Sequence, residues 1–514
     1  MNLLSLLKMR LNILIGGKAG QGINRVSKIV SNVLISQGYF VFNYRDYPSI
    51  IRGGHNFNVL SVCDGPIASH ESKLDGIIAL DSNTIEVHKS ELKTGGFIID
   101  YKGFLKYGIN LNVALSGALM KILGISENVL LEQIQKGKST NNPISVEAAK
   151  AGYASEKEKY AFKKLKNKIA ILSGSQATAI GGVHSGIDLY IAYPMTPSTN
   201  ALHEFAGMQE KFGHMTFQPE NEISVANMAV GASFAGAKVM IGSSGGGFDL
   251  MAETLSFQGI SKIPLVVYLA SRVGPGTGIP TYSMQGDLDI ALRTGHGEFP
   301  RVVVAPGDPK ENIEKVNEAL YLSQKYATLS IVLSDKHLAE SEFSVYEKLN
   351  KTIPVKVTRK VPGEGIVKAS SYECDEYGIT SEDADLAVKN ANKRLKVYEG
   401  LKNECKKFEM VKFYGNRASK NLVVGWGSTK GAIVDAIKGE DFKFMQVLYM
   451  KPLSDEIKKE MLKAKKVILV ENNLTGQLGR LIREKTGIKI EKRILKYDGR
   501  PFRSDELKED LKRV

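Results

Sequence analysis

The stretch LYIAYPMTPST, residues 189–199, decides the fold of this chain. Its first four residues are an apolar run typical of a short strand, and the Pro and Thr residues that follow are typical of a helix start. In this interpretation Thr196 caps the helix and Pro197 takes its first position. Because free N–H groups at a helix start favour a carboxylate, we expect Thr196 to touch a bound acid as well. The alternative is a capped helix start without a ligand.

Alternating strand and helix patterns extend outward from this stretch and form blocks of α/β type. The chain has 514 residues, which favours several domains over one core. We expect three α/β domains with mostly parallel sheets, at residues 1–165, 166–345 and 416–514, with a polar linker or arm at 346–415 that contains a helix around 380–411. The first block opens with a strand at 11–15, a helix through Ile35 and a strand at 39–44, which together predict a βαβ unit. Strands are further expected at 168–172, 189–192, 238–241, 265–270, 301–305, 421–426, 443–447 and 466–471.

Composition excludes several classes of protein. The formal charge of +14 is spread over the chain, which is typical of a solvated lysine-rich surface or a docking face for an acidic partner. No basic patch is interleaved with aromatic residues, so nucleic acid is not expected, and no apolar run reaches the roughly 18 residues of a membrane span. The first residues are interpreted as a leader into the first strand, or as an upstream start with Met9 the true one, rather than as a signal peptide.

The cysteines Cys63, Cys374 and Cys405 share no short spacing. Three thiols are too few for a four-cysteine iron–sulfur cluster in this chain. Reduced cysteines favour a reducing compartment, so we expect a cytoplasmic protein.

A glycine-rich loop, GGKAGQG at residues 16–22, joins the first strand to the first helix. Its spacing is G-x-x-G-x-G, which differs from the dinucleotide-binding G-x-G-x-x-G. Either Gly17, Gly20 and Gly22 form a tight turn, or their N–H groups meet a phosphate such as those of coenzyme A. Downstream, Arg52 and His55 flank a pair of glycines, a pattern suited to anion contact or to a subunit interface.

A second motif, ENEISVANMAVGASFAG at residues 220–236, places many small residues on one helix with Glu222 at its head. Such a carboxylate is either a simple helix-start charge or a partly buried acid whose pKa is raised by desolvation. The second interpretation has a specific use. A carboxyl group bonded to N1′ of the thiamine diphosphate pyrimidine promotes the imino tautomer that activates the cofactor.

These motifs together resemble the α subunit of 2-oxoacid:ferredoxin oxidoreductases, the group that includes the 2-oxoglutarate and pyruvate enzymes. The matching segments are 193–198, the helix of Glu222, 243–248, 271–278, 285–288 and 295–300. Residues 46–55, with the glycine-rich loop, resemble the γ domain that some members carry ahead of the α domain, and residues 470–479 resemble the start of a late helix in the C-terminal domain. The resemblance implies a γ domain, a pyrimidine-binding domain and a transketolase C-terminal-like domain.

The resemblance also implies roles for single residues. Glu222 would be the N1′ partner, with Glu220 as a less favoured competitor, Thr196 would bond the oxo acid group and Arg272 would pair with the substrate carboxylate. The cofactor site would also include Tyr193, Pro194 and Ser198, and the glycines Gly17, Gly20 and Gly22 would contact coenzyme A. Two positions depart from the family pattern: Met195 stands where Ile is commoner, and Gly245–Gly247 replaces a Gly-Pro-Gly run and loosens that loop.

One feature of thiamine enzymes is missing: no Gly-Asp-Gly stretch occurs in this sequence. Because Mg²⁺ needs oxygen ligands together with phosphate, another chain is expected to complete the site. The resemblance implies a β subunit that forms a heterodimer with this chain and carries the Mg²⁺–diphosphate site and a [4Fe–4S] cluster. It also implies ferredoxin as electron acceptor and coenzyme A as acyl acceptor. The alternatives are a subunit of another thiamine-dependent enzyme, such as an indolepyruvate oxidoreductase, and a non-catalytic nucleotide-binding scaffold.

Overall fold

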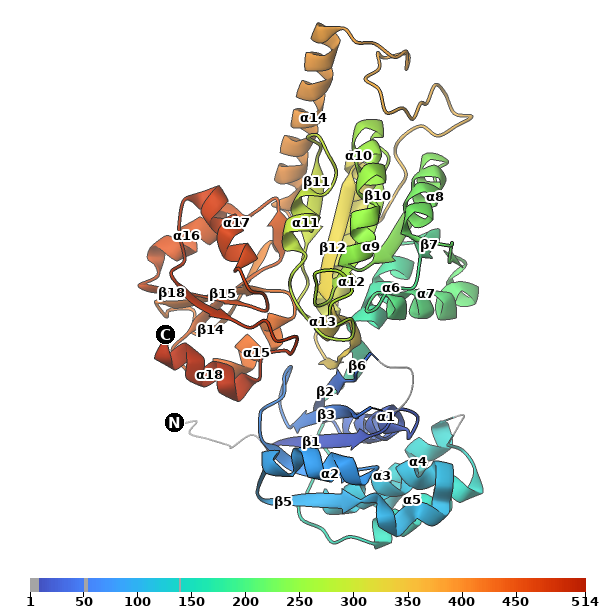
Figure 1. Ribbon diagram of the computed structural model, residues 1–514, viewed down its shortest axis with the longest axis vertical. Helices are drawn as coiled ribbons and strands as arrows, with labels where there is room; N and C mark the ends of the chain where they lie inside the picture. Colours follow the sequence, from blue (N-terminus) through green and yellow to red (C-terminus); the bar gives the residue numbers. More distant parts are fainter. Residues whose placement is uncertain (1–8, 50–53, 138–139) are drawn as a thin grey trace. The chain divides into compact units, whose positions relative to one another are not determined.

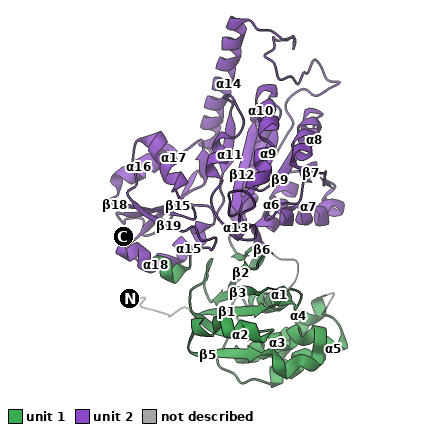
Figure 2. Ribbon diagram, viewed as in Figure 1, with its two compact units in different colours: residues 1–172, 341–346, 503–507 green, residues 173–340, 347–502, 508–514 purple. Residues whose placement is uncertain are grey.

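The computed structural model describes residues 9–49, 54–137 and 140–514 and has the expected α/β architecture, with three sheets (Figure 1). The chain divides into two compact units (Figure 2). The first contains residues 1–172, 341–346 and 503–507, and the second contains the remainder. Predictions on residues 1–8 and on Arg52 lie outside the described residues. No helix in the described part of the chain is long and apolar enough to cross a membrane.

The sheet of the first unit has the order β5-β4-β1-β3-β2-β13-β6. Its strands are β1 (Arg10–Gly17), β2 (Phe40–Asp46), β3 (Asn56–Cys63), β4 (Leu74–Ala79), β5 (Leu92–Asp100), β6 (Ala170–Ser173) and β13 (Glu342–Val345). Strands β1, β4 and β5 are parallel, whereas β3 lies antiparallel between β1 and β2. The predicted opening βαβ unit therefore needs a correction: β1 and β2 run in the same direction but are not neighbours.

The helices of this unit pack against strands of the sheet or against one another. They are α1 (Ile23–Ser36), α2 (Ser82–His88), α3 (Leu111–Ile122), α4 (Glu127–Lys136) and α5 (Pro143–Ala154). In α1 the apolar residues at helical spacing are all buried, namely Ile23, Val26, Val30, Val33 and Leu34. The helix ends as predicted before Gly38, whose φ of 82° is the left-handed conformation that glycine tolerates.

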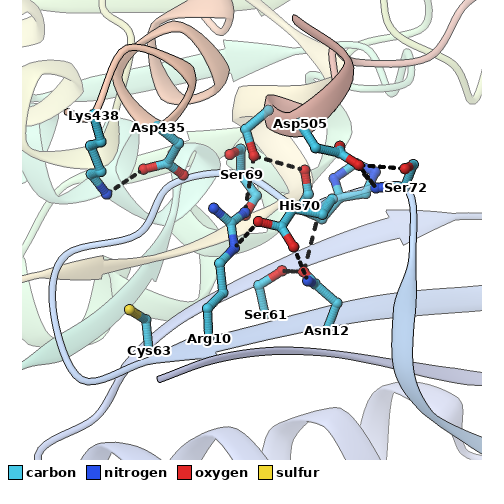
Figure 3. Close-up of polar contacts among 12 residues, drawn as sticks. Arg10, Asn12, Ser61, Cys63, Ser69, His70, Ser72, Asp435, Lys438 and Asp505 are labelled. Carbon is cyan, nitrogen blue, oxygen red and sulfur yellow. Dashed lines mark hydrogen bonds and ion pairs between the residues drawn. The ribbon is translucent and has the colours of Figure 1, made fainter. Parts of the chain in front are cut away.

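Two distant segments complete the first unit. Strand β13 pairs antiparallel with β2, and residues 503–507 contact the loop after β3 (Figure 3). There the Arg10 guanidinium donates to the Ser504 hydroxyl at 3.1 Å, and the Ser72 amide donates to the Asp505 carboxylate at 3.0 Å. The first unit is thus completed by segments that lie more than 300 positions later in the chain than the strands and loops they contact.

The second unit contains a sheet of order β17-β11-β12-β10-β9-β7-β8, in which only β17 is antiparallel to its neighbour. Its strands are β7 (Leu189–Ala192), β8 (Met215–Phe217), β9 (Val239–Ser243), β10 (Leu265–Ser271), β11 (Arg301–Val304), β12 (Leu329–Asp335) and β17 (Tyr449–Lys451). Its helices are α6 (Gly174–His184), α7 (Thr199–Phe212), α8 (Glu222–Phe234), α9 (Gly245–Leu250), α10 (Ala252–Ser261), α11 (Leu288–Arg293), α12 (Pro309–Tyr326) and α13 (Lys336–Glu340).

A third sheet in the same unit has the order β14-β16-β15-β18-β19. Its strands are β14 (Val411–Gly415), β15 (Asn421–Trp426), β16 (Lys443–Val447), β18 (Lys466–Glu471) and β19 (Lys492–Leu495). The helices of this part are α14 (Ala384–Cys405), α15 (Thr429–Ala436), α16 (Asp455–Lys463), α17 (Gln477–Thr486) and α18 (Ser504–Arg513). The strands predicted after residue 416 and the helix predicted near 380–411 are confirmed, and the division into domains stays a prediction.

A buried ionic cluster ties this third sheet to the second. The Lys430 ammonium, at the start of α15, lies between the carboxylates of Asp308 and Glu311 at the start of α12. Burial raises the pKa of Glu311, but Lys430 and the hydrogen bonds from the Gly307 amide and the Gln446 side chain together outweigh burial, and the pKa falls to about 2. Removing one partner of such a cluster would be strongly destabilising, because it would leave a buried charge without compensation.

Candidate active site

The candidate site lies where parallel strands of the second unit end. Strands β7, β9 and β10 are adjacent and parallel, so their carboxyl ends meet at one edge of the sheet. The motif of residues 193–198 follows β7, the glycine run of α9 follows β9 through Ser243 and Ser244, and Arg272 follows β10. This edge is where open parallel sheets bind ligands.

Glu222 is the first residue of α8 and is only 4% exposed. The preceding residue, Asn221, caps the helix by accepting a hydrogen bond from the Ser224 amide at 2.9 Å. The Oε1 atom of Glu222 is buried and has no hydrogen-bond partner among the described residues. A buried carboxyl oxygen without a partner is unfavourable in an isolated chain, so this atom is suited to an incoming ligand.

Gly247 makes room for the Glu222 side chain. A Cβ atom on Gly247 would lie 2.7 Å from both Cγ and Oε1 of Glu222, and would also overlap the Ser243 hydroxyl. The glycine run of α9, which departs from the family pattern, therefore has a function in packing. It lets a helix approach the buried carboxyl closely.

The competitor Glu220 has a different environment. It is exposed, and its carboxylate accepts a hydrogen bond from the Ser224 hydroxyl at 2.8 Å. Glu220 precedes α8, and its side chain is open to solvent. Of the two carboxylates, only Glu222 is enclosed.

Thr196 and Arg272 are brought together, but not in the way the sequence suggested. Residues 196–198 form a turn, and α7 begins at Thr199 with Ser198 as its cap residue. The prediction that Thr196 caps the helix and Pro197 takes its first position is therefore wrong, because the helix begins two residues later, after the turn. Instead, the Thr196 carbonyl accepts a hydrogen bond from Nη1 of Arg272 at 3.1 Å.

The guanidinium of Arg272 also interacts electrostatically with both acids of the site, Asp287 and Glu222. Burial lowers the pKa of Arg272, while the nearby carboxylates of Asp287 and Glu222 raise it. Thr196, Glu222 and Arg272 therefore lie in one neighbourhood at the strand ends. Of the other predicted cofactor residues, Ser198 is buried and donates to the Met195 carbonyl at 2.9 Å, Tyr193 is half-buried and Pro194 is exposed.

Asp287 also lies in this neighbourhood. In the sequence it stands out only as part of the segment 285–288. A Cβ on Gly245 would lie 2.6 Å from one carboxylate oxygen of Asp287 and 2.8 Å from the other, so this glycine also accommodates an acid. Burial raises the pKa of Asp287 to about 6, while the Ser271 hydroxyl and Arg272 lower it. The signal for Asp287 in the sequence is its position directly before the short helix α11.

The loop that carries Asp287 is fixed by the third sheet. The Gln285 amide N–H donates to the Asn472 carbonyl at 2.7 Å, and the Asn472 amide donates back to the Gln285 side chain at 2.9 Å. The Asn473 side chain donates to the Gln285 carbonyl at 3.1 Å, and Gln477 donates to the Gly286 carbonyl at 2.7 Å. The motif at residues 470–479 thus positions the Asp287 loop.

The glycine-rich loop of the first unit lies at the carboxyl end of β1. Gly20 and Gly22 have φ of 91° and 92°, which favours glycine at both positions. Gly22 precedes α1, a helix start with no side-chain cap and no acidic residue in its first turn. Gly17 is buried, since a Cβ there would lie 2.9 Å from Leu80. Among the described residues, no cluster of three or more His, Cys, Asp or Glu side chains is arranged to hold a metal ion.

Comparison with known proteins assigns these features to a family. The thiamine-diphosphate-binding model of the pyruvate flavodoxin/ferredoxin oxidoreductases matches residues 181–393, and the pyruvate ferredoxin/flavodoxin oxidoreductase model matches residues 12–105. The chain is 30% identical to the 2-oxoacid:ferredoxin oxidoreductase subunit alpha of Saccharolobus solfataricus, with 98% of each chain covered. It is 36% identical to the 2-oxoglutarate synthase subunit KorA of Archaeoglobus fulgidus, over 36% of this chain and 57% of that one.

A solved structure supports the same assignment. The chain is similar to the 2-oxoglutarate:ferredoxin oxidoreductase from Magnetococcus marinus with 2-oxoglutarate, coenzyme A and succinyl-CoA bound. The TM-score is 0.87 at 25% identity, and the match covers 98% of this chain and 99% of that one. The similarity therefore extends over both compact units.

Proposed function

Because the chain belongs to the family of 2-oxoacid:ferredoxin oxidoreductase alpha subunits, we propose that it forms acyl-CoA from a 2-oxo acid by oxidative decarboxylation, together with a β subunit. The substrate is 2-oxoglutarate or a range of 2-oxo acids, and ferredoxin takes the electrons one at a time. The partner contributes the Mg²⁺–diphosphate site and a [4Fe–4S] cluster. This division is supported by a sequence that has no Gly-Asp-Gly stretch and only three cysteines.

The observation that carries the proposal is the buried, unpartnered Oε1 of Glu222. The residues fit thiamine diphosphate: Glu222 provides a dry carboxyl for the pyrimidine, and Gly247 leaves the space that this side chain needs. When bound, the cofactor supplies the carbon nucleophile and the electron sink for decarboxylation. Glu222 holds the proton that is shared with ring nitrogen N1′, and its burial keeps water away from that proton.

Arg272 and Thr196 bind the substrate in this proposal. The guanidinium is held in place by the Thr196 carbonyl and offers its remaining N–H groups to the substrate carboxylate. Thr196 bonds the oxo acid group, while Tyr193, Pro194 and Ser198 border the cofactor. In the first unit, Gly17, Gly20 and Gly22 receive phosphates of coenzyme A at the uncapped start of α1.

The test compares two neighbouring glutamates in the chain co-expressed with its partner. Glu222→Gln should reduce 2-oxo acid-dependent viologen reduction by at least about 100-fold, because a positioned acid–base group contributes on this scale. Glu220→Gln is the matched control, since that side chain is exposed, and it should keep the wild-type rate. Assembly of both variants is followed by size-exclusion chromatography. Equal rates for the two variants would refute the assignment of Glu222.

A further inference from the structure

Three side chains of the first unit are connected in a line by hydrogen bonds. The Nε2 atoms of His55 and His88 are 2.7 Å apart, and Nδ1 of His88 is 3.0 Å from the Glu91 carboxylate. At the far end, Nδ1 of His55 is buried and has no partner within the described part of the chain. His55 precedes β3, His88 ends α2 and Glu91 belongs to a short 3₁₀ helix at Lys89–Glu91. The line therefore ends at an unused ring nitrogen.

The positions of the protons follow from the chemistry of the three groups. An ionised carboxylate only accepts hydrogen bonds, so His88 carries a proton on Nδ1. When both rings are neutral, Nε2 of His88 is then bare and accepts the Nε2 proton of His55. This leaves Nδ1 of His55 with a bare lone pair that is buried and has no partner among the described residues. The unused nitrogen is an acceptor, and its ligand must bring a hydrogen.

The electrostatic surroundings support a neutral His55. Burial lowers the pKa of His55 and the neighbouring His88 lowers it further, against opposing effects of Asp81, Asp46 and Glu91. The pKa of Glu91 is lowered: burial raises it, but the hydrogen bond from His88 and the charges of His88, Arg503 and Lys73 together outweigh burial.

The rings are also held rigidly. Phe57 stacks on His55 with centroids 5.6 Å apart and meets His88 edge-on at 4.7 Å. Two carboxylates that raise the pKa of His55 have other hydrogen bonds: Oδ1 of Asp81 accepts from the Thr84 amide at 2.9 Å, and Asp46 accepts from the Tyr44 hydroxyl at 2.9 Å. Oδ2 of Asp81 is buried and has no partner among the described residues. A fixed geometry of this kind suits proton transfer.

This line of residues lies at the edge of the sheet that carries the glycine-rich loop. The register of β1 and β3 pairs Gly17 with Asn56, the residue directly after His55. Asp81 caps α2 just after β4, which runs parallel to β1. The unused nitrogen therefore lies at the strand ends where residues 17–22 begin, the place proposed above for coenzyme A.

We propose that His55 is a catalytic base that takes the proton of the coenzyme A thiol, and that His88 and Glu91 are positioning residues that carry the proton outward. The S–H bond breaks, its electron pair stays on sulfur, and the proton joins Nδ1 of His55. The Nε2 proton of His55 moves to Nε2 of His88, so the positive charge ends beside Glu91. No electron is transferred in this step. The Glu91 side chain is 36% exposed, which gives water access to the proton.

A thiol is the chemical class of ligand that matches this site. A phosphate oxygen is itself an acceptor and gains nothing from a bare lone pair. A thiol has an ordinary pKa of about 8.5 and imidazole one of about 6.5, so the proton transfer is only moderately uphill, whereas an alcohol is far less acidic. This inference rests on the proposed function, because only acyl transfer to a thiol requires the step.

The experiment uses the complete complex and separates the thiol step from the earlier chemistry. The 2-oxo acid-dependent reduction of viologen in a single turnover without thiol reports the first half of the reaction, and thioester formation reports the second. His55→Gln should leave the first unchanged and lower the second by about 100-fold or more. His70→Gln is the control in the same unit, since this ring stacks on Tyr44 at 4.9 Å outside the line, and it should change neither.

Glu91→Gln supplies a milder variant with a readout that a purely structural role would not move. Without the carboxylate the imidazolium is less stable, so the acidic limb of the pH profile for thioester formation should shift to lower pH. A direct signal is the ultraviolet absorbance of the coenzyme A thiolate in the complex, with desulfo-coenzyme A as the blank. The thiolate should form at lower pH in the wild type than in His55→Gln, and a small free thiol such as cysteamine should not show the difference.

The outcomes are distinguishable. If the wild-type complex shows no 2-oxo acid-dependent reduction even without thiol, the proposed function fails. If that half-reaction is intact while His55→Gln forms thioester at the wild-type rate, or the thiolate signal is equal in both, the proton relay is refuted. Should His55→Gln not assemble, Glu91→Gln decides, because an unchanged acidic limb would refute the relay.

Discussion

At the scale of single residues, two carboxyl groups share the candidate site but differ in their surroundings. The Oε1 atom of Glu222 has no partner in the described structure, whereas Asp287 lies beside the Ser271 hydroxyl and Arg272. Burial raises the pKa of Asp287 from 3.8 to about 6. A raised pKa means that the folded state holds this proton more tightly than the unfolded chain does. Above its folded pKa the ionised Asp287 therefore destabilises the fold.

The sign of this effect makes a prediction for Asp287→Asn. Below about pH 4 both states are protonated and the variant should match the wild type; the penalty develops up to about pH 6 and is complete above it. At pH 7.5 the variant should be the more stable protein, by at most about 3 kcal/mol. Thermal unfolding at both pH values measures the difference. A melting temperature that the substitution changes equally at acid and neutral pH would contradict the assigned pKa.

Arg272 gives a second prediction at this scale. Arg272→Ala removes the fork of donors proposed to bind the substrate carboxylate, so KM for the 2-oxo acid should rise by about 10- to 100-fold, as expected for a charged hydrogen bond of about 1.5–3 kcal/mol. Steady-state kinetics of the complex measure it. Arg293→Ala is the control, because that guanidinium is exposed and pairs with Glu484 at 2.6 Å. An unchanged KM for Arg272→Ala would remove this residue from the substrate site.

At the scale of elements, helix α9 contains a matched pair of glycines. Alanine is favoured over glycine inside a helix by about 1 kcal/mol, and at Gly246 no atom lies within 4 Å of the added carbon. Gly246→Ala should therefore raise the melting temperature slightly and keep full activity. At Gly247 the same carbon meets Glu222 at 2.7 Å, so Gly247→Ala should displace that carboxyl and abolish turnover. Comparable activity of the two variants would show that turnover does not depend on the close packing of α9 against Glu222.

The same scale shows what the sequence predicts and what it does not. Strand patterns located β7, β15, β16 and β18 because most residues of each are apolar. The antiparallel strand β3 was missed, since pairing between strands is a long-range property that a local pattern does not contain. Likewise, local capping preferences predicted a helix start at Thr196, whereas the contact with Arg272 uses this residue in a turn. The helix predicted with Glu222 at its head is confirmed, and the structure adds Asn221 as its cap.

At the scale of the whole molecule, helix α8, which begins at Glu222, has an exposed face. The small residues of α8 divide into two sets: Ala226 and Ala229 are buried in the core, whereas Gly231 is exposed. The exposed stripe contains no charge and consists of Ile223, Asn227, Met228, Gly231 and the following Ala235. Uncharged, partly apolar stripes of this kind mark interaction surfaces. Because it starts next to Glu222, we expect the β subunit that completes the cofactor site to cover it.

Charge placed on this stripe tests that expectation. Ile223 and Met228 are 49% and 45% exposed, so Met228→Glu and Ile223→Glu should leave the melting temperature of the isolated chain unchanged. Each should weaken binding of the partner by at least tenfold, about 1.4 kcal/mol, because a carboxylate would be buried without a counter-charge. Sedimentation velocity at several concentrations measures the affinity. Leu462→Glu on α16, at 69% exposure, is the control that should bind normally. Wild-type affinity in the two α8 variants would place the partner on another surface, and Glu222 would then need a different source for the second half of its site.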